Sequence, residues 1–282
     1  MTKQIIACID GSGHAAAVCD AASWAAQRLD APLTFLHVQS KKSASPTNLS
    51  GSIGLGSRQQ ILNELVELDA KRNKLATEQG RLLLEDAKER VQGEGVHAGV
   101  LQRHGELVST LVELQPNTRL FIMGRRGEDT ATLFAHLGSH VEQAIRAVGV
   151  PLLVTQGQFT APRRVLVAFD GSPTMRKAIE QLAKSALLRG LELHLVLVGS
   201  DNQTNRDNLT WAATLLQNSG ITPRTRILSG DPENVLTEYQ RNNGMEMMVM
   251  GAYGHSRIRT FFVGSTTTAM IRAAQVPLLV LR

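Results

Sequence analysis

The feature that most constrains the fold of this 282-residue chain is an internal repeat. Three blocks recur in the same order in its two halves: IIACIDGS and VLVAFDGS, LFIMGRRG and MMVMGAYG, and GSHVEQAIRAVGVPLLV and GSTTTAMIRAAQVPLLV. Ordered recurrence indicates a duplicated domain, and the length suits two domains of common size. We predict an N-terminal domain over residues 1–156 and a C-terminal domain over residues 163–282, with the boundary within 155–162.

Each half alternates short β-branched and aliphatic runs with helical stretches, as a parallel α/β sheet requires. The predicted strands are 5–9, 33–38, 99–102, 120–123 and 152–155, and then 165–169, 192–198, 225–228, 247–250 and 278–281. The predicted helices include 14–29, 107–115 and 139–148, with counterparts at 174–189, 232–242 and 265–274. Each half is therefore predicted to be a five-stranded βαβ domain.

The halves differ by one large insertion, residues 43–91, between the second and third strands of the first half. A Gly/Ser/Pro-containing loop, 43–57, leads into a helical stretch, 58–91, whereas the second half has only 201–220 there. Apolar residues recur along the stretch at mostly helical spacing: Ile61, Leu62, Leu65, Leu68, Leu75 and Leu82. We interpret it as a surface helix lying over the sheet. A docking face for a partner or a second copy is the alternative.

Composition narrows the class of protein further. No apolar run approaches the roughly 18 residues that span a bilayer, and residues 1–10 lack the order of a signal peptide. We therefore expect a cytoplasmic protein without membrane association. The net charge of +5 favours anionic partners, but with 4% aromatic residues the chain offers little surface for base stacking, so nucleic acid is not expected. Cys8 and Cys19 are interpreted as small buried residues.

Carboxylates and glycines follow the strands where parallel sheets bind ligands, beyond the carboxyl ends. Asp10 and Asp170 each follow the first strand of a half, within Asp-Gly-Ser. A carboxylate there can accept hydrogen bonds from a ribose or an adenine amine, although a helix-capping role is the alternative. After the fourth strand of the second half, glycines and a helix start could hold a phosphate: Gly251, Gly254, Gly264, Ser265 and Thr266.

The pattern G-2x-G-9x-G-[ST] after strand four, the Asp after strand one and the final V-P-L-L-V resemble the universal stress protein family. The resemblance covers both halves except the insertion, and so is to the tandem type with two Rossmann-like, adenine-nucleotide α-hydrolase-like domains. It implies ATP as cofactor, with or without Mg and with no covalent cofactor. Carried over to this sequence, the implied nucleotide-binding residues are Asp170, Val198, Gly251, Gly254, Gly264, Ser265 and Thr266.

The first half carries a weaker candidate site. Its two glycines are followed by ten residues, not nine, before the next Gly-Ser, and one extra residue shifts an extended loop by up to about 3.5 Å. Arg125 and Arg126 could supply charge to a phosphate, but we interpret both as solvated surface residues. The candidate positions in this half are Asp10, Val38, Gly124, Gly127, Gly138 and Ser139.

Two classes of function remain open. In the first, the protein is a regulatory stress-response factor in which bound ATP changes the surface presented to an unknown protein partner, with at most slow hydrolysis. In the second, it is a scaffold without nucleotide that acts through protein–protein interaction. An enzyme is not expected, because no positioned base, nucleophile or complete metal-ligand set is evident, and P-loop, HExxH and GxSxG motifs do not occur.

The resemblance also bears on assembly. It implies that the last strands of the two domains pair, so that PLLVT and PLLVL meet across a pseudo-twofold axis inside one chain. The tandem chain would then be a pseudo-dimer. Association of two such chains into a homodimer is a further expectation.

Overall fold

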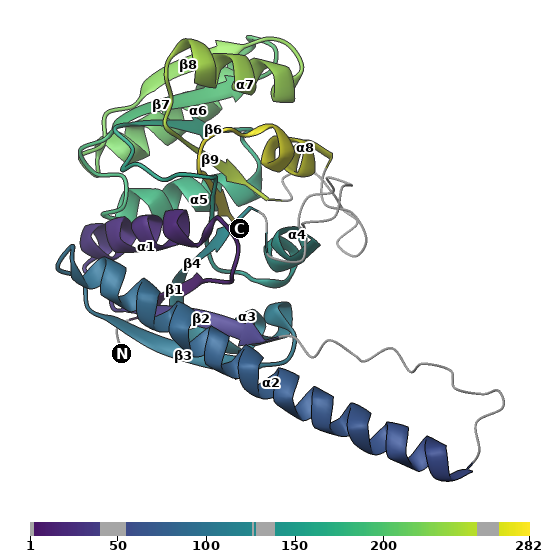
Figure 1. Ribbon diagram of the computed structural model, residues 1–282. Coiled ribbons are helices and arrows are strands. Elements are labelled where there is room, and N and C mark those ends of the chain that lie inside the picture. Colours follow the sequence, from purple (N-terminus) through teal and green to yellow (C-terminus); the bar gives the residue numbers. More distant parts are fainter. Residues whose placement is uncertain (1–2, 40–54, 126, 128–138, 253–264) are drawn as a thin grey trace.

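The computed structural model describes residues 3–39, 55–125, 127, 139–252 and 265–282 (Figure 1). The first half contains β1 (Gln4–Cys8), α1 (Ala15–Leu29), β2 (Leu33–Gln39), α2 (Leu55–Gln92), β3 (Ala98–His104), α3 (Leu107–Leu114), η1 (Gln115–Asn117), β4 (Thr118–Gly124), α4 (Ser139–Ala147) and β5 (Leu152–Thr155). The second contains β6 (Arg164–Ala168), α5 (Pro173–Lys184), β7 (Glu192–Val198), α6 (Gln203–Gln217), β8 (Arg224–Leu228), α7 (Pro232–Asn242), β9 (Met247–Gly251), α8 (Ser265–Ala273) and β10 (Leu278–Leu281).

The described strands form one ten-stranded sheet in the order β3-β2-β1-β4-β5-β10-β9-β6-β7-β8. Pairing within each half is parallel, and β5 and β10 join the halves in antiparallel register, with Leu153 opposite Leu279. The predicted fold class is therefore confirmed: two five-stranded α/β units of the same topology form a pseudo-dimer in one chain. The predicted pairing of the last strands is confirmed as well.

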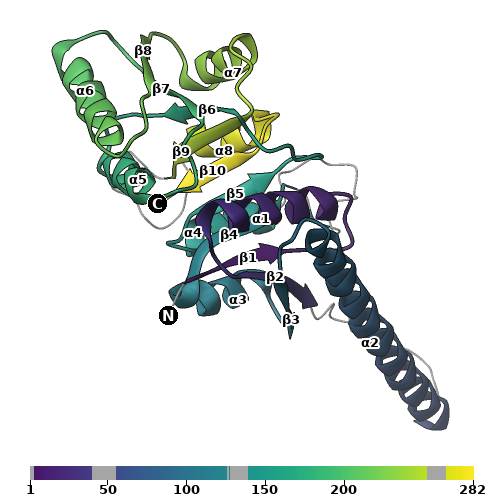
Figure 2. The same ribbon diagram turned by 90° about the vertical axis from the view of Figure 1, so that its left-hand side faces the viewer.

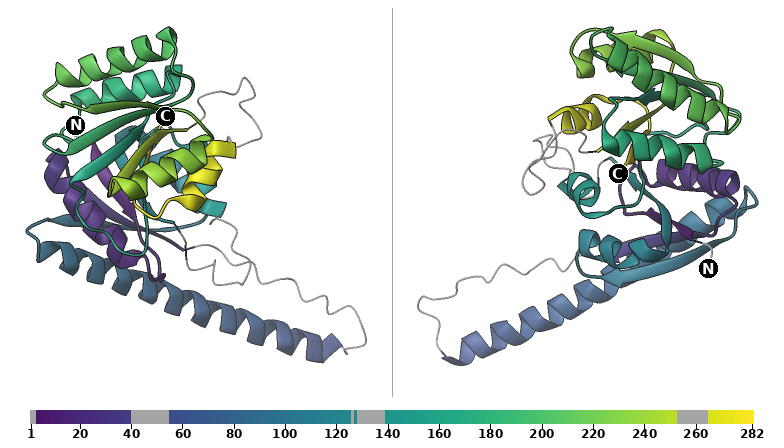
Figure 3. Two further views of the ribbon diagram at one scale, coloured as in Figure 1. Left: turned by 90° about the horizontal axis from the view of Figure 1, so that it is seen from above. Right: turned by 180° about the vertical axis from the view of Figure 1, so that it is seen from behind.

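Helices cover both faces of this sheet, which explains why the strands are almost continuously apolar. α1, α2, α5 and α6 lie on one face, and α3, α4, α7 and α8 lie on the other (Figures 1 and 3). Each face has its own buried cluster, and each cluster contains residues from both halves. The core therefore runs without interruption across the joint between the domains.

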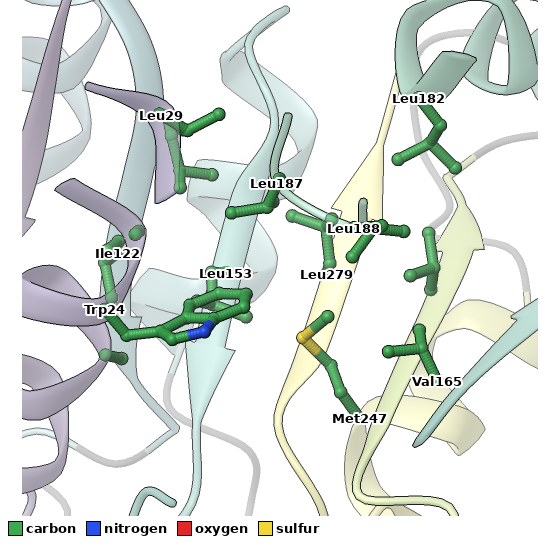
Figure 4. Close-up of a cluster of buried hydrophobic side chains, with 14 of the residues drawn as sticks. Trp24, Leu29, Ile122, Leu153, Val165, Leu182, Leu187, Leu188, Met247 and Leu279 are labelled. Atoms are coloured by element: carbon green, nitrogen blue, oxygen red, sulfur yellow. The ribbon is translucent and has the colours of Figure 1, made fainter. Parts of the chain in front are cut away.

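Side chains from the two halves interdigitate where β5 meets β10 (Figure 4). Trp24 of α1 packs against Phe159 with ring centroids 5.6 Å apart. Leu153, Leu188 and Leu279 are at most 1% exposed in the same cluster. Because large apolar side chains of either half complete the core of the other, separating the halves would expose them to water.

The predicted helix 174–189 is wrong at its carboxyl end, because α5 ends at Lys184. The following turn buries Leu187 and Leu188 at the joint. Arg28 of α1 donates to the Leu187 carbonyl at 3.2 Å, and to the carbonyls of Ala186 and Arg189. Contacts with the other half thus hold this segment out of the helical conformation that its local sequence favours.

The interpretation of Arg125 as a solvated surface residue is also wrong. Its Nη1 donates to the carbonyls of Arg272 and Ala274, at 3.3 and 3.2 Å, at the carboxyl end of α8. In the opposite direction, Arg282 donates to the carbonyls of Arg146 and Val148 at the end of α4. Each half therefore places an arginine on the negative end of a helix of the other half, where a cation is stabilising. Arg126 lies outside the described residues.

The inserted helix α2 covers the sheet only with its carboxyl-terminal part (Figures 1 and 2). Leu84, Ala87 and Val91 are buried there, and Arg90 makes a bidentate ion pair with Asp20 of α1, with N–O distances of 2.6 and 3.0 Å.

The contact of α2 with the sheet ends near Gly80. This residue lies so close to β2 and β3 that a Cβ would approach side-chain atoms of Gln102 and His37 within 2.5 Å. Residues 63–75 are all exposed. The expectation of a helix lying over the sheet thus holds for its last turns alone.

We predict that the two halves unfold as one unit and that Leu188→Ala destabilises both. Leu188 is 0% exposed, and truncating a buried leucine costs about 2–5 kcal/mol. Denaturant unfolding followed by far-UV circular dichroism and by tryptophan fluorescence should show a single coincident transition, shifted to lower denaturant. The control Val112→Ala, at a residue 39% exposed, should change the unfolding free energy by no more than about 0.5 kcal/mol. Two separate transitions, with only one shifted, would contradict the prediction.

Candidate functional site

Three predicted site residues of the second half meet at the carboxyl edge of adjacent strands. Ala168 of β6 pairs with Val196 of β7, and Asp170 and Val198 each lie two residues beyond that pair. Gly251 ends β9, which pairs with the other side of β6. The strand order reverses between β6 and β9, because β7 and β8 continue to one side and β10 lies on the other. These residues therefore surround the position where open α/β sheets bind ligands.

The Asp-Gly-Ser turn after β6 has a specific geometry. The Asp170 Oδ1 accepts a hydrogen bond from the Ser172 N–H at 2.9 Å, and Gly171 adopts φ = 71°, which favours glycine. The Ser172 hydroxyl then caps α5 by accepting from the Met175 N–H at 3.2 Å. The capping alternative for Asp170 is thus wrong: Ser172 is the cap, and the carboxylate fixes the turn at the sheet edge.

Gly251 has a packing requirement of its own. A Cβ at this position would lie 2.8 Å from the Met175 Sδ and 3.0 Å from its Cγ, in the first turn of α5. Glycine therefore lets the end of β9 approach the start of α5. The end of β9 and the start of α5, which both border the reversal point, are therefore in close contact.

The first half assembles the corresponding residues at its own sheet edge. The Asp10 Oδ1 accepts from the Ser12 N–H at 3.0 Å, as Asp170 does in the second half. A Cβ at Gly127 would lie 2.9 Å from the Asp10 Oδ2, so the chain after β4 passes directly over this carboxylate. Gly124 ends β4, next to β1, and Val38 lies near the end of β2 on the other side of β1.

The remaining predicted positions are described in part or not at all. Ser139 and Ser265 begin α4 and α8, and Thr266 is the second residue of α8, so the helix starts lie where the sequence predicts them. Gly138, Gly254 and Gly264 lie outside the described residues. The loop between the second glycine and the next Gly-Ser has ten residues in the first half, 128–137, and nine in the second, 255–263. Both loops also lie outside the described residues.

Sequence reasoning missed a polar group beside the second-half turn. A Cβ at Gly171 would lie 2.7 Å from the Asn208 Nδ2 of α6. Arg176 donates to the Asn208 Oδ1, and its guanidinium carbon lies 4.6 Å from the centre of the Trp211 ring. The polar run at the start of α6 was the only signal, and nothing in it indicates a contact with α5.

The two cysteines of the first half lack the properties of a nucleophile. Burial raises the pKa of the Cys19 thiol, which is 3% exposed, to about 12. Burial, and then the nearby charge of Asp10, raise the pKa of the half-buried Cys8 to about 12. Both thiols are therefore protonated at neutral pH, and a thiol is a poor nucleophile compared with a thiolate.

Among the described residues, no helix combines the length and the apolar character needed to cross a bilayer.

The fold and the residues at its strand ends define a tandem α/β protein with a candidate ligand-binding edge in each half. The model of the universal stress protein family matches residues 1–156 and 199–282. The chain therefore belongs to the universal stress protein family. It is similar to the universal stress protein Slr1230 of Synechocystis, with 37% identity over 99% of this chain and 100% of that protein.

A solved structure supports this fold over the full length of the chain. The chain is similar to a universal stress protein from Archaeoglobus fulgidus, with a TM-score of 0.75 and 22% identity over 100% of this chain and 99% of that one. Two shorter universal stress proteins, one in complex with cAMP and one from A. fulgidus in complex with dAMP, each match 44% of this chain with TM-scores of 0.38 and 0.35. Those two relatives thus bind adenine nucleotides.

We predict that neither native thiol reacts with Ellman's reagent at pH 8. With a pKa of about 12, only about one thiol in ten thousand is ionised at that pH, and the fraction rises only as the pH approaches 12. In guanidinium chloride both cysteines should react. The control Val66→Cys places a thiol at a position 68% exposed on α2 and should add one fast-reacting group to the native protein. Fast labelling of the unsubstituted native chain would contradict the pKa values.

Proposed function

We propose that this chain is an ATP-binding regulatory stress-response factor with its principal site in the second half. The observation that carries the proposal is the meeting of Asp170, Val198 and Gly251 at the reversal point of the strand order. Asp170 and the main chain at Val198 would hold the adenosine. The glycine-spaced loop and the α8 start, with Ser265 and Thr266, would hold the phosphates.

The distribution of charge supports this choice of half. Residues 1–156 contain sixteen Lys and Arg and sixteen Asp and Glu, whereas residues 157–282 contain fourteen basic residues and nine acidic ones. The whole net charge of +5 therefore belongs to the second half. A positive field raises the local concentration of a polyanion such as ATP and favours its association.

In the first half, Asp10, Val38, Gly124 and Gly127 form the second candidate site. Its extra loop residue lies between the glycines that would contact phosphate, so we expect weaker binding there than in the second half. We expect ATP, with or without Mg, to act as a regulatory ligand that is hydrolysed slowly if at all. A scaffold that binds no nucleotide is the competing function.

We predict that the purified chain binds ATP in calorimetric titrations and that Gly264→Val weakens this binding at least about tenfold. The valine would crowd the approach of the phosphates to the start of α8, and a loss of about 1.4 kcal/mol already corresponds to tenfold. Gly138→Val, the matched change in the first half, should leave the tighter binding event unchanged.

The outcomes of this titration separate the two functions. Equal heats from the unsubstituted chain and Gly264→Val would reject the phosphate site at α8. No heat from any of the three proteins would favour the scaffold. If Gly138→Val alone weakened ATP binding, the principal site would lie in the first half instead.

A further inference from the structure

The exposed part of α2 carries an unusual concentration of large apolar side chains. Of the seven large apolar residues exposed in the described chain, five lie on this helix: Leu65, Val66, Leu68, Leu75 and Leu82, with 41%, 68%, 60%, 71% and 47% exposure. The helix extends away from the body of the protein, so that no other described helix or strand covers this part (Figures 2 and 3). Exposed apolar groups gathered on one element mark an interaction surface.

Most of these side chains follow a seven-residue repeat. Leu68, Leu75 and Leu82 are spaced by seven, and Leu65 precedes Leu68 by three. With Arg72 and Gln79 they occupy alternating a and d positions of a heptad, the pattern of a coiled-coil seam. We call these six residues, 65, 68, 72, 75, 79 and 82, the α2 seam. Val66 lies outside it, on the opposite side of the helix.

The α2 seam is distinct from the face with which the helix packs on its own domain. That face is formed by Gly80, Leu84, Ala87 and Val91, which are all buried. At 100° per residue, Leu82 and Leu84 point about 200° apart around the helix axis. Among the described residues, the core therefore does not cover the seam, and a partner can approach it without displacing α2 from the sheet.

We propose that the α2 seam binds the α2 seam of a second copy of the chain as an antiparallel two-stranded coiled coil. Centred between Asn73 and Lys74, this pairing sets Leu65 against Leu82 of the second copy over about 26 Å of helix. A two-fold contact needs only one self-complementary surface and closes at two copies.

Charges beside the α2 seam favour the antiparallel direction. The register places Lys71 next to Glu78 of the second copy, and the symmetry repeats this pair. Glu64 comes near Glu85 of the second copy. Arg81 pairs with both Glu78 and Glu85, at 2.6 and 2.5 Å, and so offsets only part of the charge of each. A parallel pairing would instead place Arg72 opposite Arg72 of the second copy, and Glu64 beside Asp69 of the second copy. Both contacts join like charges and are repulsive.

The mass of the full-length chain in solution tests the proposal. Sedimentation equilibrium without nucleotide should show a species of twice 30.6 kDa at micromolar concentration. Leu68→Glu/Leu75→Glu should give a monomer with an unchanged circular dichroism spectrum, because both side chains are exposed in the single chain. Val66→Glu, equally exposed but outside the α2 seam, should remain dimeric.

Charge reversal tests the register and direction. Lys71→Glu should raise the dimer dissociation constant about tenfold, because it replaces two attractive pairs with two repulsive ones. Adding Glu78→Lys should restore the constant to within about threefold of the original. A chain that stays monomeric at 100 µM, a dimer that survives Leu68→Glu/Leu75→Glu, or a double reversal without restoration would each overturn the proposal.

Discussion

The antiparallel contact between β5 and β10 is the constraint on which the rest of the structure depends. It turns two five-stranded sheets into one and removes the edge that each would otherwise present to other chains. Trp24 and Leu188 then complete a core shared by both halves, and Arg125 and Arg282 bind helix ends across the joint. The two candidate sites are therefore held in a fixed mutual orientation.

Much of this architecture was predictable from the sequence because both faces of the sheet are covered. Buried parallel strands appear as short apolar runs, and every predicted strand lies within three residues of an observed one at each end. The end of α5 and the contacts of Arg125 were not predictable. Local sequence favours a longer helix and a solvated arginine at these places, and the docking of the other half decides against both.

The candidate site shows the same division between local and distant determinants. Asp170, Val198 and Gly251 could be predicted because the carboxyl ends of parallel strands meet at one edge of the sheet. Residues that directly follow such strands therefore lie close together in space. Asn208 could not, because its place beside Gly171 depends on how α6 packs against α5. The reach of α2 also escaped prediction: its heptad spacing is visible in the sequence, but the extent of sheet available to cover it is not.

Joining two domains in one polypeptide has an evolutionary consequence. In a homodimer of single domains every mutation appears at both sites, so a change that improves one function necessarily alters its twin. Here a long helix has been added to one half and the glycine-loop spacing altered in that half alone. Covalent linkage thus frees the two sites to diverge, so that one can be conserved for a ligand while the other acquires a separate task.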